Sequence, residues 1–190
     1  MKIVLVGPPG SGKSTQGLKI RNDFNFQRVS TGDVFREYFR EHNDFQGVYT
    51  KQNLDNGVLC SDEIMNQFVA DEILTPVGER LILDGYPRTC AQARAFDLLM
   101  RKRGERYIII HFSLKNDDMI LERILLRGEK REDDSENIIR ERLQTYRKEA
   151  MTLIPTLIKN NQFFLEIDAW QSPENIYNQI KPYLQALLEE

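Results

Sequence analysis

The stretch that decides the fold is IVLVGPPGSGKS, residues 3–14. Its second part, from Gly7 to Ser14, fits the pattern G-x-x-x-x-G-K-[ST] without a gap, and its first part is an apolar run typical of a buried strand. In this pattern, glycines let consecutive backbone N–H groups point around a polyphosphate, and the helix that follows presents its positive amino-terminal end to the same anion. Lys13 adds a point charge for the outer phosphates. The stretch therefore predicts a strand, a phosphate-binding loop and a helix, in that order.

Further short runs rich in β-branched or aromatic residues follow, and helix-length amphipathic sequence separates each from the next. This alternation predicts an α/β fold, a five-stranded parallel sheet with helices on both faces. Between the second and third runs, residues 31–80 carry apolar residues at helical spacing. We expect this helical insertion to cover the carboxyl edge of the sheet, where open α/β sheets bind ligands. The later runs are residues 27–30, 81–83, 107–112 and 163–167.

The composition is that of an ordinary globular protein, and we expect one domain over residues 1–190. A formal net charge of -3 gives a field that favours neither nucleic acid nor an anionic membrane. The apolar amino terminus is too short for a signal peptide or a membrane span. Cys60 and Cys90 are too few for a disulfide framework and lack metal-ligand spacing, and His42 and His111 are far apart. We therefore expect a cytosolic protein with free thiols and no histidine metal site.

Two motifs lie where expected strands end. Asp84 follows the third run, at the point where proteins with the same phosphate-binding loop place an Asp on Mg²⁺ or its water shell. By itself, Asp-Gly would be only a turn signal. The motif Ser-Thr-Gly-Asp at residues 30–33 fits a helix start, with Ser30 as the cap, and also fits presentation of Thr31 and Asp33 to a ligand.

Arginines accompany these motifs and the polar stretch at residues 128–135. Phosphoryl transfer asks little covalent chemistry of a protein and mostly needs fixed positive charge around the migrating group. A solvated basic face explains any single arginine, but it explains the set poorly, because each belongs to an expected loop at the same sheet edge. The set is Arg36, Arg88, Arg123, Arg127, Arg131 and Arg142.

With this ordered series of motifs, the chain resembles the adenylate kinases of the nucleoside monophosphate kinase family, in the bacterial form with a very short lid. The resemblance implies a P-loop three-layer sandwich with an insertion at about residues 30–60 that binds the nucleoside monophosphate, and a lid at about residues 127–135. It implies reversible transfer of the γ-phosphoryl group of MgATP to AMP. It rests on residues 7–16, 30–33 and 84–89, on Arg123-x-x-x-Arg127, on residues 131–134 and on Arg142-x-x-x-Tyr146.

The same resemblance implies the site residues. ATP would be bound by Gly10, Ser11, Gly12, Lys13, Ser14, Thr15, Arg127 and Gln171. AMP would be bound by Thr31, Arg36, Val58, Leu59, Cys60, Gly85, Tyr86, Pro87, Arg88, Gln92, Arg131 and Arg142. The transferring phosphoryl group would be surrounded by Lys13, Arg88, Arg123, Arg131 and Arg142. Mg²⁺ would be held, directly or through water, by Ser14, Thr15, Asp84 and Asp33.

Some details depart from the family pattern. The family usually reads Gly-Lys-Gly-Thr where this chain has Gly-Lys-Ser-Thr, so the hydroxyl directed at Mg²⁺ is either that of Ser14 or that of Thr15. The lid lacks the long insertion that carries zinc in other members, so no zinc is expected. Trp170 follows the fifth run, and we expect it to pack rather than to stack on a base.

The acceptor base is the main open point. A UMP/CMP kinase shares the phosphate machinery, but Gln92 favours AMP, because adenylate kinases place Gln there and pyrimidine kinases usually have an Asn-rich run. A nucleotide-binding switch protein is the alternative from a different class, and the many arginines supplied by the chain itself speak against it. We expect a cytoplasmic monomer that acts on the small nucleotides ATP and AMP, with no nucleic acid or membrane partner.

Overall fold

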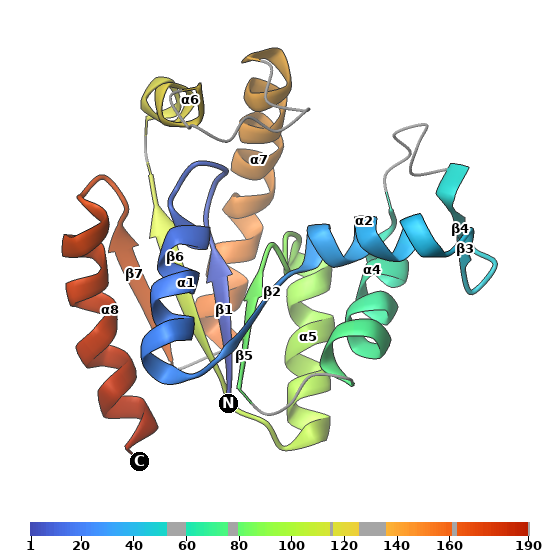
Figure 1. The fold of residues 1–190 in the computed structure, drawn as a ribbon, viewed down its shortest axis with the longest axis horizontal. Coiled ribbons are helices and arrows are strands. Elements are labelled where there is room, and N and C mark those ends of the chain that lie inside the picture. The colour runs from blue at the N-terminus through green and yellow to red at the C-terminus, as the bar shows by residue number, and fades with distance from the viewer. Residues whose placement is uncertain (53–59, 76–79, 115, 126–135, 161–162, 190) are drawn as a thin grey trace.

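The centre of the molecule is a five-stranded parallel sheet, as predicted (Figure 1). The computed structural model describes residues 1–52, 60–75, 80–114, 116–125, 136–160 and 163–189. The strand order is β2-β5-β1-β6-β7, with every pairing parallel. The strands are β1 (Lys2–Val6), β2 (Gln27–Ser30), β5 (Leu81–Asp84), β6 (Tyr107–Ser113) and β7 (Phe164–Asp168). They reproduce the expected runs to within one residue at each end.

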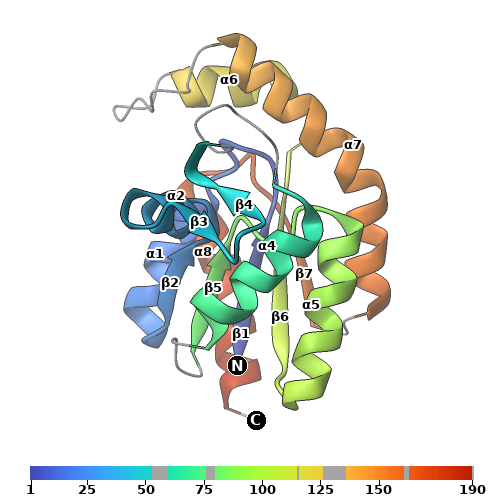
Figure 2. The same cartoon turned by 90° about the vertical axis from the view of Figure 1, so that its right-hand side faces the viewer.

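Helices cover both faces of this sheet (Figure 2). One face carries α1 (Lys13–Phe24) and α8 (Pro173–Leu188), and the other carries α5 (Cys90–Arg103) and the long α7 (Glu136–Asn160). Successive residues of a strand point to opposite faces, so alternate residues of β1 join two separate apolar cores. The three-layer arrangement is thereby confirmed.

Between β2 and β5 the chain forms an insertion that projects to one side of the sheet (Figure 1). The expected helices are present, but the structure adds a small β-hairpin that the sequence did not predict. Strands of two residues are too short to produce a recognisable alternation. Gly47 turns this hairpin with φ 69°. The elements are α2 (Thr31–Glu41), β3 (Asp44–Phe45), β4 (Tyr49–Thr50) and α4 (Asp62–Phe68), which continues as a π-helical segment, Val69–Leu74.

An aromatic cluster holds the insertion together. Phe35 of α2 lies 4.9 Å from Phe68 of α4 and 5.6 Å from Tyr49 of the hairpin, between ring centroids. Phe45 of the hairpin also contacts Phe68, at 5.4 Å. Edge-to-face contacts of this kind add to the stability that burial of the rings provides. The cluster is continuous with the core beneath α5, so the insertion is anchored to the sheet by its own apolar interior.

Above the carboxyl ends of the strands, α6 (Asp117–Leu125) lies beside the first turns of α7 (Figure 1). The lid expected at about residues 127–135 lies outside the described residues. So do Val58, Leu59, Arg127 and Arg131. Among the helices that the structure describes, none is long and apolar enough to cross a membrane.

Candidate active site

The phosphate-binding loop leads from β1 into α1. Gly10 and Gly12 have left-handed backbone, with φ 76° and 86°, which side chains rarely allow. A Cβ on Gly10 would also lie 2.8 Å from Cγ1 of Ile124, so glycine is needed there for space as well. The fully described helix α1 begins at Lys13 with no side-chain cap and no acidic residue in its first turn. A helix start of this kind suits a bound phosphate.

Lys13 folds back over this loop. Its ammonium donates hydrogen bonds to the carbonyls of Gly7, at 2.8 Å, and Pro8, at 2.7 Å, and lies 3.3 Å from Oγ of Ser11. Phosphate oxygens are stronger partners for an ammonium than neutral carbonyls. The side chain is therefore placed to exchange these contacts for a nucleotide.

Asp84 lies at the end of β5, directly beside β1. Its Oδ2 accepts a hydrogen bond of 2.9 Å from Oγ of Ser14, whereas Thr15 is exposed. This contact favours Ser14 over Thr15 as the hydroxyl directed at Mg²⁺. A nearly buried carboxylate and a hydroxyl are hard oxygen donors, which suit that ion.

Arg28 is a residue that the sequence analysis missed. From β2 it forms an ion pair of 2.5 Å with the same Oδ2 of Asp84, and the two side chains are only 18% and 8% exposed. Its stem passes α1 at Gly17, where an added Cβ would lie 2.9 Å from Cδ of Arg28. The available signal was an arginine inside a strand of an apolar sheet, since unpaired arginine is rarely buried.

A second candidate site for a phosphate lies at the start of α2. An added Cβ on Gly32 would lie 3.5 Å from Nη1 of Arg36 and 3.6 Å from Nη2 of Arg88, so two guanidinium groups approach the same point. Thr31 donates from Oγ1 to the backbone carbonyl of Asp84 at 3.1 Å. Convergent positive charge at a helix start fits a phosphate.

Asp33 was expected near Mg²⁺, and the structure shows it ion-paired with Arg36. Both side chains are more than half exposed. Asp33 therefore belongs with Arg36 at α2 rather than with Ser14 and Asp84. Ser30 occupies the cap position of α2, as expected, but its side chain makes no capping hydrogen bond.

The side chain of Gln92 lies in the first turn of α5, next to the backbone of Arg88. It is 6% exposed, and its amide is bonded to the backbone N–H of Arg88 and to Asp62. Tyr86 and Pro87 are buried beside it, and Gly85 takes φ 95°. The turn at residues 85–88 is thus tightly packed against α5.

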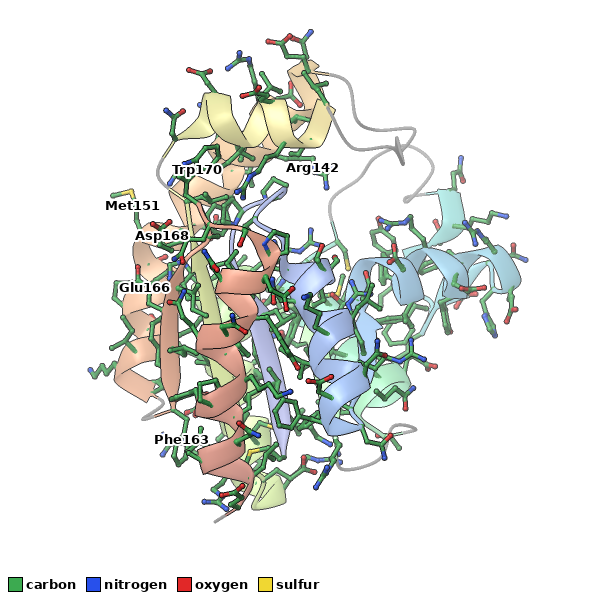
Figure 3. All side chains as sticks on the ribbon, turned by 60° about the vertical axis from the view of Figure 1, so that its left-hand side comes forward. Arg142, Met151, Phe163, Glu166, Asp168 and Trp170 are labelled. Carbon is green, nitrogen blue, oxygen red and sulfur yellow. The ribbon has the colours of Figure 1, made fainter. Side chains whose placement is uncertain are left out.

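Arg123 points to the loop after β7. It donates to the carbonyl of Ala169 at 2.8 Å, and its guanidinium stacks 4.5 Å from the ring of Trp170. Trp170 packs against this arginine, as expected of a packing residue. It does so at the surface rather than in the core, since its side chain is 46% exposed. Gln171 bonds through its side-chain amide to the carbonyl of Asp168 at 3.1 Å. Figure 3 shows Trp170 and Arg142 at the same end of the molecule, next to α6.

His111 is buried in β6. Its Nε2 lies 3.3 Å from the hydroxyl of Tyr146, one helical turn after Arg142 on α7, and its Nδ1 lies 3.9 Å from Glu166. Burial lowers the pKa of His111, Lys13 acts in the same direction, and Glu166 opposes both. Burial also raises the pKa of Tyr146 to about 12. The pair is therefore neutral near pH 7.

Comparison with known proteins identifies the family. The model of the adenylate kinase family matches residues 5–162. The chain belongs to this family. It is 35% identical over 161 residues to the adenylate kinase of Micrococcus luteus, covering 83% of this chain and 78% of that protein. It is 36% identical over 156 residues to the enzyme of Mycolicibacterium smegmatis, covering 81% and 84%, and 35% identical over 155 residues to that of Mycobacterium tuberculosis, with the same coverage.

Family membership decides between the readings left open by the sequence. The chain is an enzyme, an ATP:AMP phosphotransferase, and the UMP/CMP kinase alternative is not favoured. Among the described residues there is no group of three or more His, Cys, Asp or Glu side chains that could hold a metal ion by themselves.

Proposed function

We propose that the chain transfers the γ-phosphoryl group of ATP reversibly to AMP across Asp84, giving two ADP. The observation that carries this proposal is the position of Asp84 between two phosphate-binding arrangements. Its carboxylate accepts from Ser14 at the phosphate-binding loop, and its backbone carbonyl accepts from Thr31 at the start of α2. Two anions bound on these sides would meet next to one carboxylate, as a donor and an acceptor of a phosphoryl group must.

ATP binds at the loop on the β1 side. The backbone of Gly10, Ser11 and Gly12 surrounds its phosphates, with Ser14 and Thr15 at the start of α1. Lys13 leaves its carbonyl partners and follows the charge that develops on the migrating group. Gln171, in the loop beside Trp170, and Arg127 hold the adenine.

Ser14 and Asp84 would hold Mg²⁺, directly or through water, with Thr15 and Asp33 as the further oxygen donors expected for the ion. When bound, Mg²⁺ would supply positive charge that neutralises the transferring phosphoryl group. Arg28 fixes the carboxylate of Asp84 through Oδ2, the oxygen that also accepts from Ser14.

AMP binds on the α2 side. Arg36 and Arg88 hold its phosphate, and Thr31 and Gly85 lie next to the guanidinium group of Arg88 in the same site. Gln92 meets the base. Burial raises the pKa of the Cys60 thiol to about 11, so this residue is a neutral neighbour for the nucleotide. Tyr86, Pro87, Val58 and Leu59 complete the acceptor site.

Arg88, Arg123, Arg131 and Arg142 surround the phosphoryl group in the transition state. Arg123 is bonded to Ala169 and stacked on Trp170, at the loop that carries Gln171. Binding of ATP beside this loop recruits Arg123 to the phosphates. Closure of the acceptor insertion and the short lid then excludes water from the reacting groups.

We also propose that the enzyme works in the cytoplasm as a monomer, without nucleic acid or membrane partners. Its two free cysteines suit a reducing compartment. The exposed large apolar side chains of the described residues are spread over several elements, among them Leu18 of α1, Val48 of the hairpin and Met151 of α7. Scattered exposure of this kind is normal for a monomer. Light scattering coupled to gel filtration measures the oligomeric state.

A coupled assay with AMP, CMP, UMP and GMP as acceptors tests the function. We expect AMP to have the highest kcat/KM by about a hundredfold or more, since a buried amide rejects a base that cannot pair with it. Lys13→Ala should keep the fold and reduce kcat by about a thousandfold, because it removes charge needed in the transition state. Higher kcat/KM with CMP or UMP, or near-normal turnover of a folded Lys13→Ala protein, contradicts the proposal.

A further inference from the structure

The side-chain amide of Gln92 is held at both ends. Its Oε1 accepts a hydrogen bond of 2.7 Å from the backbone N–H of Arg88, and its Nε2 donates one of 2.8 Å to Oδ1 of Asp62. The other carboxylate oxygen of Asp62 accepts from Oγ1 of Thr89 at 2.8 Å. Thr89 in turn accepts from the backbone N–H of Gln92 at 3.1 Å, as the cap of α5. The four groups form a closed network.

This network permits only one orientation of the amide. A backbone N–H can only donate, and a carboxylate can only accept. If the amide were rotated by 180°, Nε2 would face the N–H of Arg88 and Oε1 would face Asp62. Both contacts would be repulsive in a site where Gln92 is 6% exposed, and unsatisfied buried groups are costly. Asp62 disfavours the rotated amide, because its carboxylate would then face Oε1 of Gln92 instead of Nε2.

The fixed amide still has hydrogen-bonding capacity. An amide oxygen has two acceptor positions and an amide nitrogen has two N–H donors. Each atom makes one of its two bonds to a described residue, which leaves one acceptor on Oε1 and one donor on Nε2. A base that meets this edge must present a donor opposite Oε1 and an acceptor opposite Nε2.

We propose that Asp62 is a positioning residue that sets base specificity by locking Gln92 in this orientation. The proposal rests on the proposed function, in which Gln92 meets the acceptor base. A 6-amino purine presents an amino donor beside a ring-nitrogen acceptor, which matches the locked amide. A 6-oxo purine presents a carbonyl acceptor beside a ring N–H donor, which requires the rotated amide. Asp62 therefore excludes 6-oxo purines, although Gln92 by itself can pair with either class.

The location of Asp62 supports this role. It belongs to the first turn of α4, whereas Gln92 belongs to α5 and Thr89 is the N-cap of that helix. A turn further on, α4 also contacts the turn before α5, where the hydroxyl of Tyr86 donates to Oδ1 of Asn66 at 2.7 Å. The carboxylate that orients the amide is thus supplied by the insertion, while the amide itself stands on the sheet-packed helix.

The test compares AMP with IMP as acceptor, because these nucleotides differ only in exchange of the 6-amino for the 6-oxo edge. Asp62→Ala should lower the ratio of kcat/KM for AMP to that for IMP by about tenfold, with KM for ATP unchanged. Asp62→Asn should also lower the ratio, because its side-chain amide can face Gln92 with either an acceptor oxygen or a donor NH2 group. Glu63→Ala is the matched control, since Glu63 shares the first turn of α4 and makes no contact with Gln92. The control should leave the ratio unchanged.

A double-mutant cycle separates locking from a general structural effect. In a Gln92→Ala background, Asp62→Ala should have no further effect on the ratio. An unchanged ratio in Asp62→Ala, or an equal fall in both backgrounds, overturns the proposal. If Gln92→Ala alone leaves the AMP kinetics unchanged, Gln92 does not meet the base, and the premise fails together with the proposal. Circular dichroism and thermal unfolding of each variant confirm that the comparison is made on folded protein.

Discussion

One carboxylate oxygen, Oδ2 of Asp84, contacts both the phosphate-binding loop region and the neighbouring strand β2. Oδ2 of Asp84 accepts from both Ser14 and Arg28, so the proposed metal site already contains a positive charge when no nucleotide is bound. Gly17 gives the stem of Arg28 room, since an added Cβ there would lie 2.9 Å from Cδ of Arg28. A nearly buried carboxylate without a partner would be costly, and Arg28 removes that cost.

Arg28→Gln should therefore lower the free energy of unfolding by about 2 kcal/mol in the absence of Mg²⁺ and nucleotide. Urea denaturation measures this loss. Arg101→Gln is the control, because its pair with Asp97 lies at the surface, with Arg101 67% exposed, and such pairs contribute about 0.5 kcal/mol or less. An equal loss of unfolding free energy in the two variants would show that the pair of Arg28 with Asp84 stabilises the fold no more than a surface ion pair does.

At the scale of elements, the acceptor insertion is one packed unit. The ring of Phe68 on α4 is fully buried and contacts rings from α2 and from the β3–β4 hairpin. These ring contacts join the three elements, and a hydrogen bond of 3.1 Å from the side-chain amide of Gln46 to Asp71 adds to them. The start of α2, with Arg36, moves with that unit.

Phe68→Leu should loosen the insertion without disturbing the sheet. We expect the free energy of unfolding to fall by about 1–2 kcal/mol and amide exchange to accelerate in α2 and the hairpin more than in β1. KM for AMP should rise several-fold, whereas KM for ATP should stay the same, because the phosphate-binding loop lies outside the cluster. A rise in KM for ATP of the same size would argue against separate units.

At the scale of the whole molecule, His111 connects the sheet to α7. Lys13, Tyr146 and Glu166 are the charged or titratable groups that face it. Its pKa in the folded protein lies below the ordinary value of 6.5, chiefly because of burial. The unfolded chain therefore binds a proton at a higher pH than the folded chain does, and the stability that His111 contributes above about pH 6.5 is lost as the pH falls below it.

His111→Gln should flatten the fall in unfolding free energy between pH 6.5 and about pH 5, where few carboxylates titrate. Denaturant unfolding at a series of pH values measures the slope. His42→Gln serves as the control, because His42 is exposed and its replacement should leave the slope as it is. A wild-type slope in His111→Gln would mean that other groups cause the acid sensitivity.

Nucleotide binding should also act on the molecule as a whole. A bisubstrate analogue that joins ATP to AMP should raise the melting temperature, with about 2.7 kcal/mol of added stability at a concentration of 100 times its Kd. If the acceptor insertion closes over the ligands, amide exchange should slow in α2 and the hairpin as well as in the phosphate-binding loop. Slowing confined to the loop would contradict closure as the step that assembles the site.

Local rules in the sequence determined the sheet, the phosphate-binding loop and the place of Asp84. Strands, glycine turns and helix starts depend on neighbouring residues, so the run at residues 3–14 predicted β1, the loop and α1 together. The two arginines that approach Gly32 could be predicted as a set for the same reason, because each follows a recognisable motif.

Only the tertiary structure decided which residue pairs with which. Arg28 reaches Asp84 across 56 residues of chain, Asp62 reaches Gln92 across 30, and Arg123 reaches Ala169 across 46. Such contacts depend on strand order and helix packing, which bring together residues that no local pattern relates. The sequence by itself therefore determined the kind of site, whereas packing decided how its side chains are held and oriented.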